Sequence, residues 1–303
     1  MRLDRGRFTV VAYPADVRLA RTLLDSASAR DTFPGLPRPR MRALIAVAPD
    51  GRRFREWVGP AAPEWGAAIA IPEEQRIVMQ GGNAGSDAGN PFRVLRHELA
   101  HLALHEYLGD RPPRWFDEGY ASYSAAEWGR DDALATNISL ALHGVPQLDS
   151  LDAGFQSNAS RADATYALSY RAVADLASLD PQRGLALFFR YWKETGSMDV
   201  AIRRAYGLTE AAFEARWRSH TMHRYGILAL LANVTVIMAL LGFVIVPLYI
   251  VRLRRRRRAL AAMLVADAAA ERAARASALA ALLANGGTLD VPGELRQPEP
   301  PPS

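Results

Sequence analysis

Hydrophobic residues follow a mixed pattern over the first 90 positions of the chain. Phe8, Val10 and Ala12 occupy alternate positions, which predicts a strand. Val17–Ala29 repeats its apolar residues at helical spacing. Short apolar runs bounded by proline and glycine continue the pattern: Leu44–Ala48, Ala67–Ile71 and Ile77–Gln80. Residues 1–90 are therefore interpreted as a small mixed α/β lobe, which ends in the glycine-rich loop Gly81–Asn90.

From residue 91 to residue 225 the pattern is helical. Asn90 and Pro91 supply an N-cap and a first-turn proline, which together predict a helix start. Breaks are expected where turn-forming residues gather: Gly109–Pro113, Gly144–Pro146, Asp180–Pro181 and Gly207. These patterns predict an α+β fold in which the N-terminal lobe, with an edge strand, packs on the helical lobe.

Residues 226–251 carry no charge over 26 positions and are followed at once by an arginine cluster. A membrane-crossing helix needs roughly 20 apolar residues. A buried core helix is the alternative, but the flanking arginines favour one transmembrane helix. Positive flanks stay in the cytoplasm, so we expect residues 1–225 outside it and residues 252–303 inside. Arg254–Arg258 are then expected to contact anionic lipid.

The sequence also gives predictions for the two ends of the chain. Residues 252–285 are predicted to form a basic and then alanine-rich helix, and residues 286–303 a disordered tail. The first 20 residues do not resemble a signal peptide. We therefore expect that the true start lies upstream, with a translocated N-terminal tail or a cytoplasmic domain as alternatives.

Composition narrows the possible functions. The chain has no cysteine, which excludes disulfides, cysteine-ligated metal sites and a cysteine nucleophile. Its net charge is +5, but residues 252–303 hold nine arginines against five acids, or +4, which leaves 5 − 4 = +1 for the remainder. Because the basic residues cluster outside the folded part, nucleic acid is not expected as a partner.

The segment His97-Glu98-Leu-Ala-His101 carries the clearest chemical signal. On a helix, His97 and His101 project from one face one turn apart and can bind a single Zn²⁺. Glu98 can then act as general base on the metal's water molecule. His105 lies one further turn along, about 6 Å from His101, so it is better interpreted as a surface or outer-layer histidine. Glu118, in Trp-Phe-Asp-Glu-Gly-Tyr-Ala, is the candidate third ligand.

This two-part motif resembles the gluzincin metallopeptidases, in particular the peptidase MA-like group, over most of residues 7–220. The resemblance implies a helical zincin-type part and a zinc-dependent peptidase. It also implies an edge strand that binds substrate, with Gly66, Ala67 and Ala68 as its candidate residues. Tyr166 is the implied catalytic tyrosine that stabilises the oxyanion, with Tyr170 second.

Three further points bear on this resemblance. The aminopeptidase branch carries a GAMEN-type strand that is absent here, which favours an endopeptidase acting on a peptide or on an envelope or membrane protein. Charged residues flank the motif, unlike in intramembrane proteases: Arg93, Arg96 and Glu106. The alternatives are a catalytically inactive binding or assembly module, and a scaffold in which the motif is coincidence.

Overall fold

The computed structural model describes residues 1–59, 67–82, 89–109, 112–127, 144–157 and 159–285. The chain divides into two compact units, Met1–Val234 and Thr235–Ser303. Several regions on which the sequence analysis made predictions lie outside the described residues: Gly66, positions 83–88 of the glycine-rich loop, residues 110–111 and 128–143 of the predicted helical lobe, and the tail 286–303.

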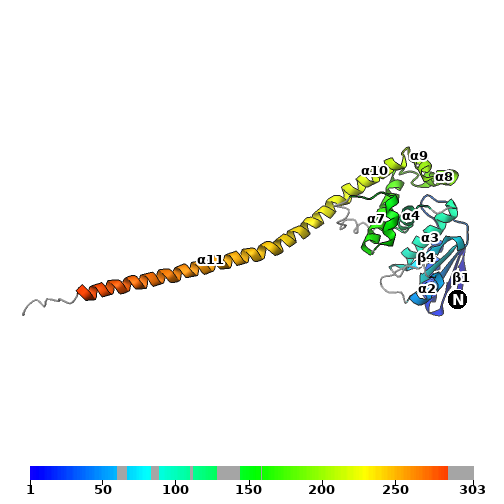
Figure 1. The fold of residues 1–303 in the computed structure, drawn as a ribbon. Helices are drawn as coiled ribbons and strands as arrows, with labels where there is room; N and C mark the ends of the chain where they lie inside the picture. Colours follow the sequence, from blue (N-terminus) through cyan, green and yellow to red (C-terminus); the bar gives the residue numbers. More distant parts are fainter. Residues whose placement is uncertain (60–66, 83–88, 110–111, 128–143, 158, 286–303) are drawn as a thin grey trace, which may run out of the picture. The chain divides into compact units, whose positions relative to one another are not determined.

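A five-stranded sheet forms the N-terminal part of the first unit (Figure 1). Its strands are β1 (Arg2–Arg5), β2 (Phe8–Ala12), β3 (Ala43–Ala48), β4 (Ala68–Ile71) and β5 (Arg76–Gln80). Their order is β1-β2-β3-β5-β4, with β2, β3 and β5 parallel and β1 and β4 antiparallel to their neighbours. The strand predicted at Phe8–Ala12 is confirmed as β2, and the three short apolar runs correspond to β3, β4 and β5, whereas β1 was not predicted. Strand β4 lies at one edge of the sheet.

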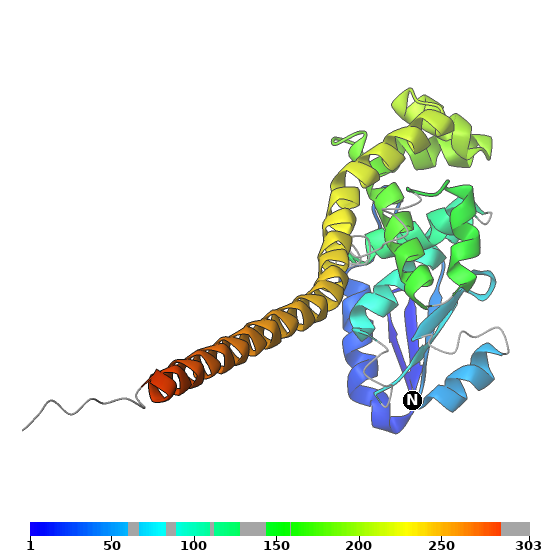
Figure 2. The same ribbon diagram turned by 60° about the vertical axis from the view of Figure 1, so that its left-hand side comes forward.

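Helices cover both faces of this sheet because the strands bury apolar side chains on both sides. The main core joins Val10, Ile45 and Ile77 to α1 (Val17–Ala29), as predicted, and to α3 (Pro91–Leu108). On the opposite face Val78 packs against Phe54 of α2 (Gly51–Val58). Figure 2 shows α1 and α2 on opposite sides of the sheet.

The other helices that the structure describes in the first unit follow α3 along the chain. They are α4 (Arg114–Ser124), the 3-10 helix η5 (Asp149–Gln156), α7 (Ala159–Ser178), α8 (Ala186–Thr195), α9 (Met198–Tyr206) and α10 (Glu210–Thr221). The short 3-10 turn η1 (Pro14–Asp16) joins β2 to α1, and η2 (Pro72–Glu74) joins β4 to β5. A π turn, η6 (Met222–Gly226), follows α10. Phe116 of α4 contacts the rings of Phe188, Phe189 and Trp192 on α8, which ties α4 to the C-terminal helices.

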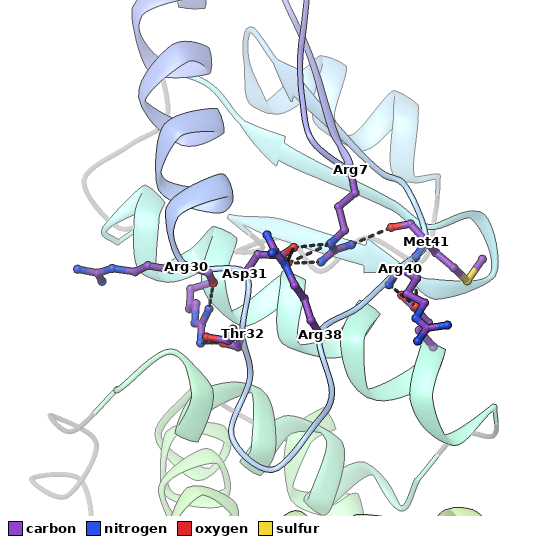
Figure 3. A network of polar contacts seen from close by, with 9 residues as sticks. Arg7, Arg30, Asp31, Thr32, Arg38, Arg40 and Met41 are labelled. Atoms are coloured by element: carbon purple, nitrogen blue, oxygen red, sulfur yellow. Dashed lines mark hydrogen bonds and ion pairs between the residues drawn. The ribbon is translucent and has the colours of Figure 1, made fainter.

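Polar contacts fasten α3 to the segment that joins α1 to β3. The guanidinium group of Arg96 donates to the carbonyl oxygens of Arg30 and Thr32, whose positions Figure 3 shows. Further along α3, Glu106 accepts hydrogen bonds from the backbone N–H groups of Arg40 (2.7 Å) and Met41 (3.2 Å). These contacts hold α3 near both of its ends and so fix the position of the helix that carries the HExxH residues.

The predicted fold class is wrong in its last element. The chain is mostly helical with one small sheet, and residues 226–251 do not form a separate element, because α11 (Ile227–Asn285) continues through the arginine cluster. Within the part of the chain that the structure describes, no helix is long and apolar enough to cross a membrane.

The predicted localisation is contradicted by the same finding. A single-pass membrane protein with residues 1–225 outside the cytoplasm and residues 252–303 inside would need the span that the described residues do not provide. Arg254–Arg258 are exposed on α11, and their contact with lipid stays a prediction.

Candidate functional site

Helix α3 presents the two histidines of the motif on one face. Asn90 caps it, with its side chain accepting a hydrogen bond from the backbone N–H of Phe92 (2.9 Å), and it ends at Gly109, whose φ of 76° favours glycine. The rings of His97 and His101 lie 4.9 Å apart between their centroids. Both side chains are only 12% exposed. The helix therefore holds two imidazoles together in a mostly buried place.

Helix α4 brings Glu118 to these histidines. Its Oε2 atom lies 3.4 Å from His97 Nε2 and 3.8 Å from His101 Nε2, and the three ligand atoms could hold a metal ion. Ligands about 2.1 Å from a tetrahedral zinc lie about 3.4 Å from one another. The nitrogen and oxygen donors and their separations thus fit zinc.

A carboxylate contacts the other ring nitrogen of each histidine. Asp117 Oδ1 lies 2.6 Å from His101 Nδ1, and Glu127 Oε1 lies 3.4 Å from His97 Nδ1. The hydrogen bond to Asp117 favours the His101 tautomer with hydrogen on Nδ1, and the nearby negative charge of Glu127 favours the same tautomer of His97; each leaves the Nε2 lone pair free for a metal. The arrangement therefore orients both imidazoles toward Glu118.

Glu127 reaches His97 because of how α4 ends. The N–H of Glu127 donates to the carbonyl oxygen of Ser122 (3.2 Å), and the N–H of Ala126 donates to that of Tyr123 (3.2 Å). These two bonds form a Schellman turn, with Ala126 in the left-handed region at φ 55°. A left-handed alanine is strained, and here the turn directs the chain back toward α3.

The charges of these groups depend strongly on one another in the metal-free protein. Burial disfavours the charged form of His97, but the carboxylates of Glu118 and Glu127 outweigh it and raise the pKa of His97 to about 10. For His101, burial is likewise outweighed by Asp117, which raises its pKa to about 9. The pKa of Glu118 is lowered, since the neighbouring imidazoles outweigh its burial. A metal ion must therefore displace protons from the two histidines.

Glu98 points from the next position on α3 toward the edge strand. Burial raises its pKa, although both neighbouring histidines and a hydrogen bond with the Ala70 backbone lower it. A raised carboxyl pKa suits a group that takes up and releases a proton.

The edge strand β4 exposes only alternate backbone groups. Ala67 accepts a hydrogen bond from the N–H of Gln80, so its carbonyl group faces β5. Ala68 and Ala70 occupy the alternate positions, and their backbone groups therefore face the outer edge, where Glu98 lies. Of the predicted edge residues, Ala68 presents its backbone outward, Ala67 does not, and Gly66 lies outside the described residues.

The two candidate tyrosines lie on α7 in different surroundings. Tyr166 is partly buried, and its ring packs edge-on against Phe155 at 4.9 Å. The guanidinium of Arg114 lies 4.8 Å from the same phenyl ring, and its Nε is 4.0 Å from Glu118 Oε1. Tyr170 is buried, with its ring 6.2 Å from that of Tyr123. Tyr166 thus belongs to a group of side chains that extends to Glu118.

Sequence reasoning assigned no role to Asp117, Glu127 or Arg114. Asp117 directly precedes the candidate ligand Glu118 in the motif, so a search for a carboxylate partner of His101 could have found it. Glu127 had no comparable signal, because a turn with an alanine in the left-handed region brings it to His97.

Comparison with known proteins agrees with this geometry. The sequence profile of the Peptidase MA superfamily matches residues 61–223, just over half of the chain, including α3 and α4. Among curated proteins, none matches this chain closely enough to count as a relative.

Proposed function

Because this chain belongs to the peptidase MA superfamily, we propose that it is a zinc-dependent peptidase, in particular an endopeptidase that cleaves peptides or proteins. The single observation that carries the proposal is the convergence of His97, His101 and Glu118 within 4.8 Å, with Glu98 beside them. The donor atoms and their separations match a three-residue zinc site that leaves a fourth position open.

In this proposal His97 Nε2, His101 Nε2 and a Glu118 oxygen hold the metal. When bound, zinc polarises the scissile carbonyl group and makes a water molecule more acidic. Asp117 and Glu127 keep the imidazoles in the required tautomer from their Nδ1 side.

Glu98 is the proposed general base. Its carboxylate accepts the proton of the attacking water and then donates it to the leaving amine. Its raised pKa supports both transfers, because the group holds a proton more readily than an exposed glutamate does. Its neighbour β4 supports a substrate that binds in extended form along Ala68, where the outward backbone groups offer hydrogen bonds.

Tyr166 is the proposed donor to the oxyanion, with Tyr170 as the second choice. The packing of Tyr166 on Phe155, which also supports Arg114 next to Glu118, favours Tyr166. The burial of Tyr170 against Tyr123 places it less favourably for contact with substrate.

The Glu98→Gln variant tests the proposed function. It removes the base but no metal ligand, so we expect cleavage of casein or a peptide library to fall about 10²–10⁴-fold. Zinc content should stay at the wild-type level. Glu56→Gln on α2, an exposed glutamate paired with Arg52, is the matched control and should leave cleavage unchanged. Cleavage by Glu98→Gln near the wild-type rate would contradict the mechanism, and a wild-type protein that binds zinc without cleaving would favour an inactive binding module.

A further inference from the structure

A second group of potential metal ligands lies next to the first. His101, His105 and Asp117 also bring their donor atoms within 4.8 Å of one another. The distances distinguish the two groups. His101 Nδ1 to Asp117 Oδ1 is 2.6 Å, and His105 Nε2 to Asp117 Oδ2 is 2.9 Å. Both are hydrogen-bond lengths and are shorter than the roughly 3.4 Å that separates two ligands of a tetrahedral zinc. This second group is therefore a hydrogen-bonded chain of side chains.

The chain has a definite order because each oxygen of Asp117 contacts a different histidine. His101 and His105 are four residues apart on α3, so their rings lie one above the other on one face. Asp117, in the first turn of α4, lies across from both rings and accepts on Oδ1 from His101 and on Oδ2 from His105. All three side chains are mostly buried, with exposed fractions of 12%, 11% and 20% for His101, His105 and Asp117.

This arrangement has a physical consequence for His101. A carboxylate that accepts a single hydrogen bond can rotate about it, whereas a carboxylate that accepts a hydrogen bond at each oxygen is held in a fixed plane. With His105 in place, the lone pair of Asp117 that meets His101 Nδ1 keeps its direction. Without His105, Asp117 Oδ2 would lose its contact in a mostly buried place, and the carboxylate would turn toward water or another donor.

We propose that His105 is a positioning residue for the metal centre: through Asp117 it holds the imidazole of His101 in the orientation that metal binding needs. The inference rests on the proposed function, since it assumes that His97, His101 and Glu118 bind zinc. It assigns His105 no contact with the metal or the substrate.

Zinc affinity of the full-length protein, measured by competition with a chelator, tests the proposal. His105→Leu removes the donor, and we expect about tenfold weaker binding, the lower end of the range for outer partners of metal ligands. His105→Gln places an amide N–H near the position of the lost Nε2–H, so it should restore affinity to within about threefold. If the leucine variant does not fold, His105→Phe, which keeps the ring without a donor, gives the same comparison.

A double-mutant cycle separates this role from a general structural one. Asp117→Asn alone should weaken zinc binding about 10–100-fold. Adding His105→Leu to it should cause no further loss, because His105 acts only through Asp117. His223→Leu is the control for removing an exposed histidine, and it should bind zinc like the wild type.

Three outcomes would overturn the inference. One is wild-type affinity in His105→Leu. Another is that His105→Leu and His105→Gln weaken zinc binding equally and that their effects add to the effect of Asp117→Asn. A residue with a merely structural role would give this result. In the third, the wild-type protein binds no zinc at all, which refutes the proposed metal centre together with this inference. The first two leave the proposed function intact.

Discussion

Gly119 lets α4 and α7 pack closely beside the candidate site. A Cβ atom added there would lie 2.4 Å from the carbonyl oxygen of Ser169, 2.7 Å from its carbonyl carbon and 3.0 Å from Val173 Cγ2. The first two atoms belong to the backbone of α7 and cannot rotate away. Gly119→Ala therefore requires the two helices to separate, and α4 carries the neighbouring Glu118.

The expected cost follows from two opposing effects. Overpacking costs about 1–3 kcal/mol, and a clash with backbone belongs at the upper end, about 3 kcal/mol. Alanine is favoured over glycine in a helix by about 1 kcal/mol. The net loss in the free energy of unfolding is then about 2 kcal/mol, which lowers Tm by roughly 4–8 °C for a domain of this size.

Thermal or urea unfolding of the metal-free variant measures this loss, and chelator competition measures the accompanying loss of zinc affinity. Gly51→Ala is the matched control, because a Cβ atom there would meet only the side-chain ends of Arg55 and Gln80 at 3.5 and 3.6 Å. We expect the control to keep its stability or to gain up to about 1 kcal/mol, because the added Cβ atom meets no clash there. Wild-type stability and zinc affinity in Gly119→Ala would refute the argument that close helix packing positions Glu118.

Three further predictions concern the same site. Tyr166→Phe should lower kcat about 10²–10³-fold with little change in KM or zinc content; a Phe variant with unchanged kcat would exclude Tyr166 from the mechanism. Ala126→Gly should stabilise the protein by about 1 kcal/mol in urea unfolding, because glycine adopts a φ of 55° without strain; a loss of stability would contradict this. In the folded, metal-free protein the pKa values of His97 and His101 are about 10 and 9, above the ordinary histidine value of 6.5. The two protonated histidines therefore stabilise the fold, and this contribution is fully present below about pH 6.5. That contribution is lost as pH rises through those values, while zinc affinity should increase up to about tenfold per pH unit for each displaced proton, as chelator competition at about pH 7, 8 and 9 would test.

Local sequence patterns determined the main secondary structure of the first unit. The alternation at Phe8–Ala12 and the helical period of Val17–Ala29 correspond to β2 and α1. The cap at Asn90 and Pro91 marks the start of α3. These features depend on neighbouring residues, so they can be predicted without knowledge of distant contacts. The same local reasoning failed at residues 226–251, where it treated an uncharged run as an element of its own.

The candidate metal ligands could also be identified from sequence, though their use in binding stays a proposal. A helix places residues four apart on one face, which accounts for His97 and His101. The motif around Glu118 indicated a third ligand, but only the packing of α4 against α3 places its carboxylate 3.4 Å from His97.

The surroundings of these ligands were decided by tertiary structure alone. Glu127 contacts His97 because a Schellman turn through Ala126 reverses the direction of the chain. No local sequence pattern predicts an alanine in the left-handed region. His105 and Asp117 meet because α4 packs across α3. Hydrogen bonds between side chains of different helices depend on how those helices pack, and packing is set by shape complementarity over the whole core, which spacing along the chain does not encode.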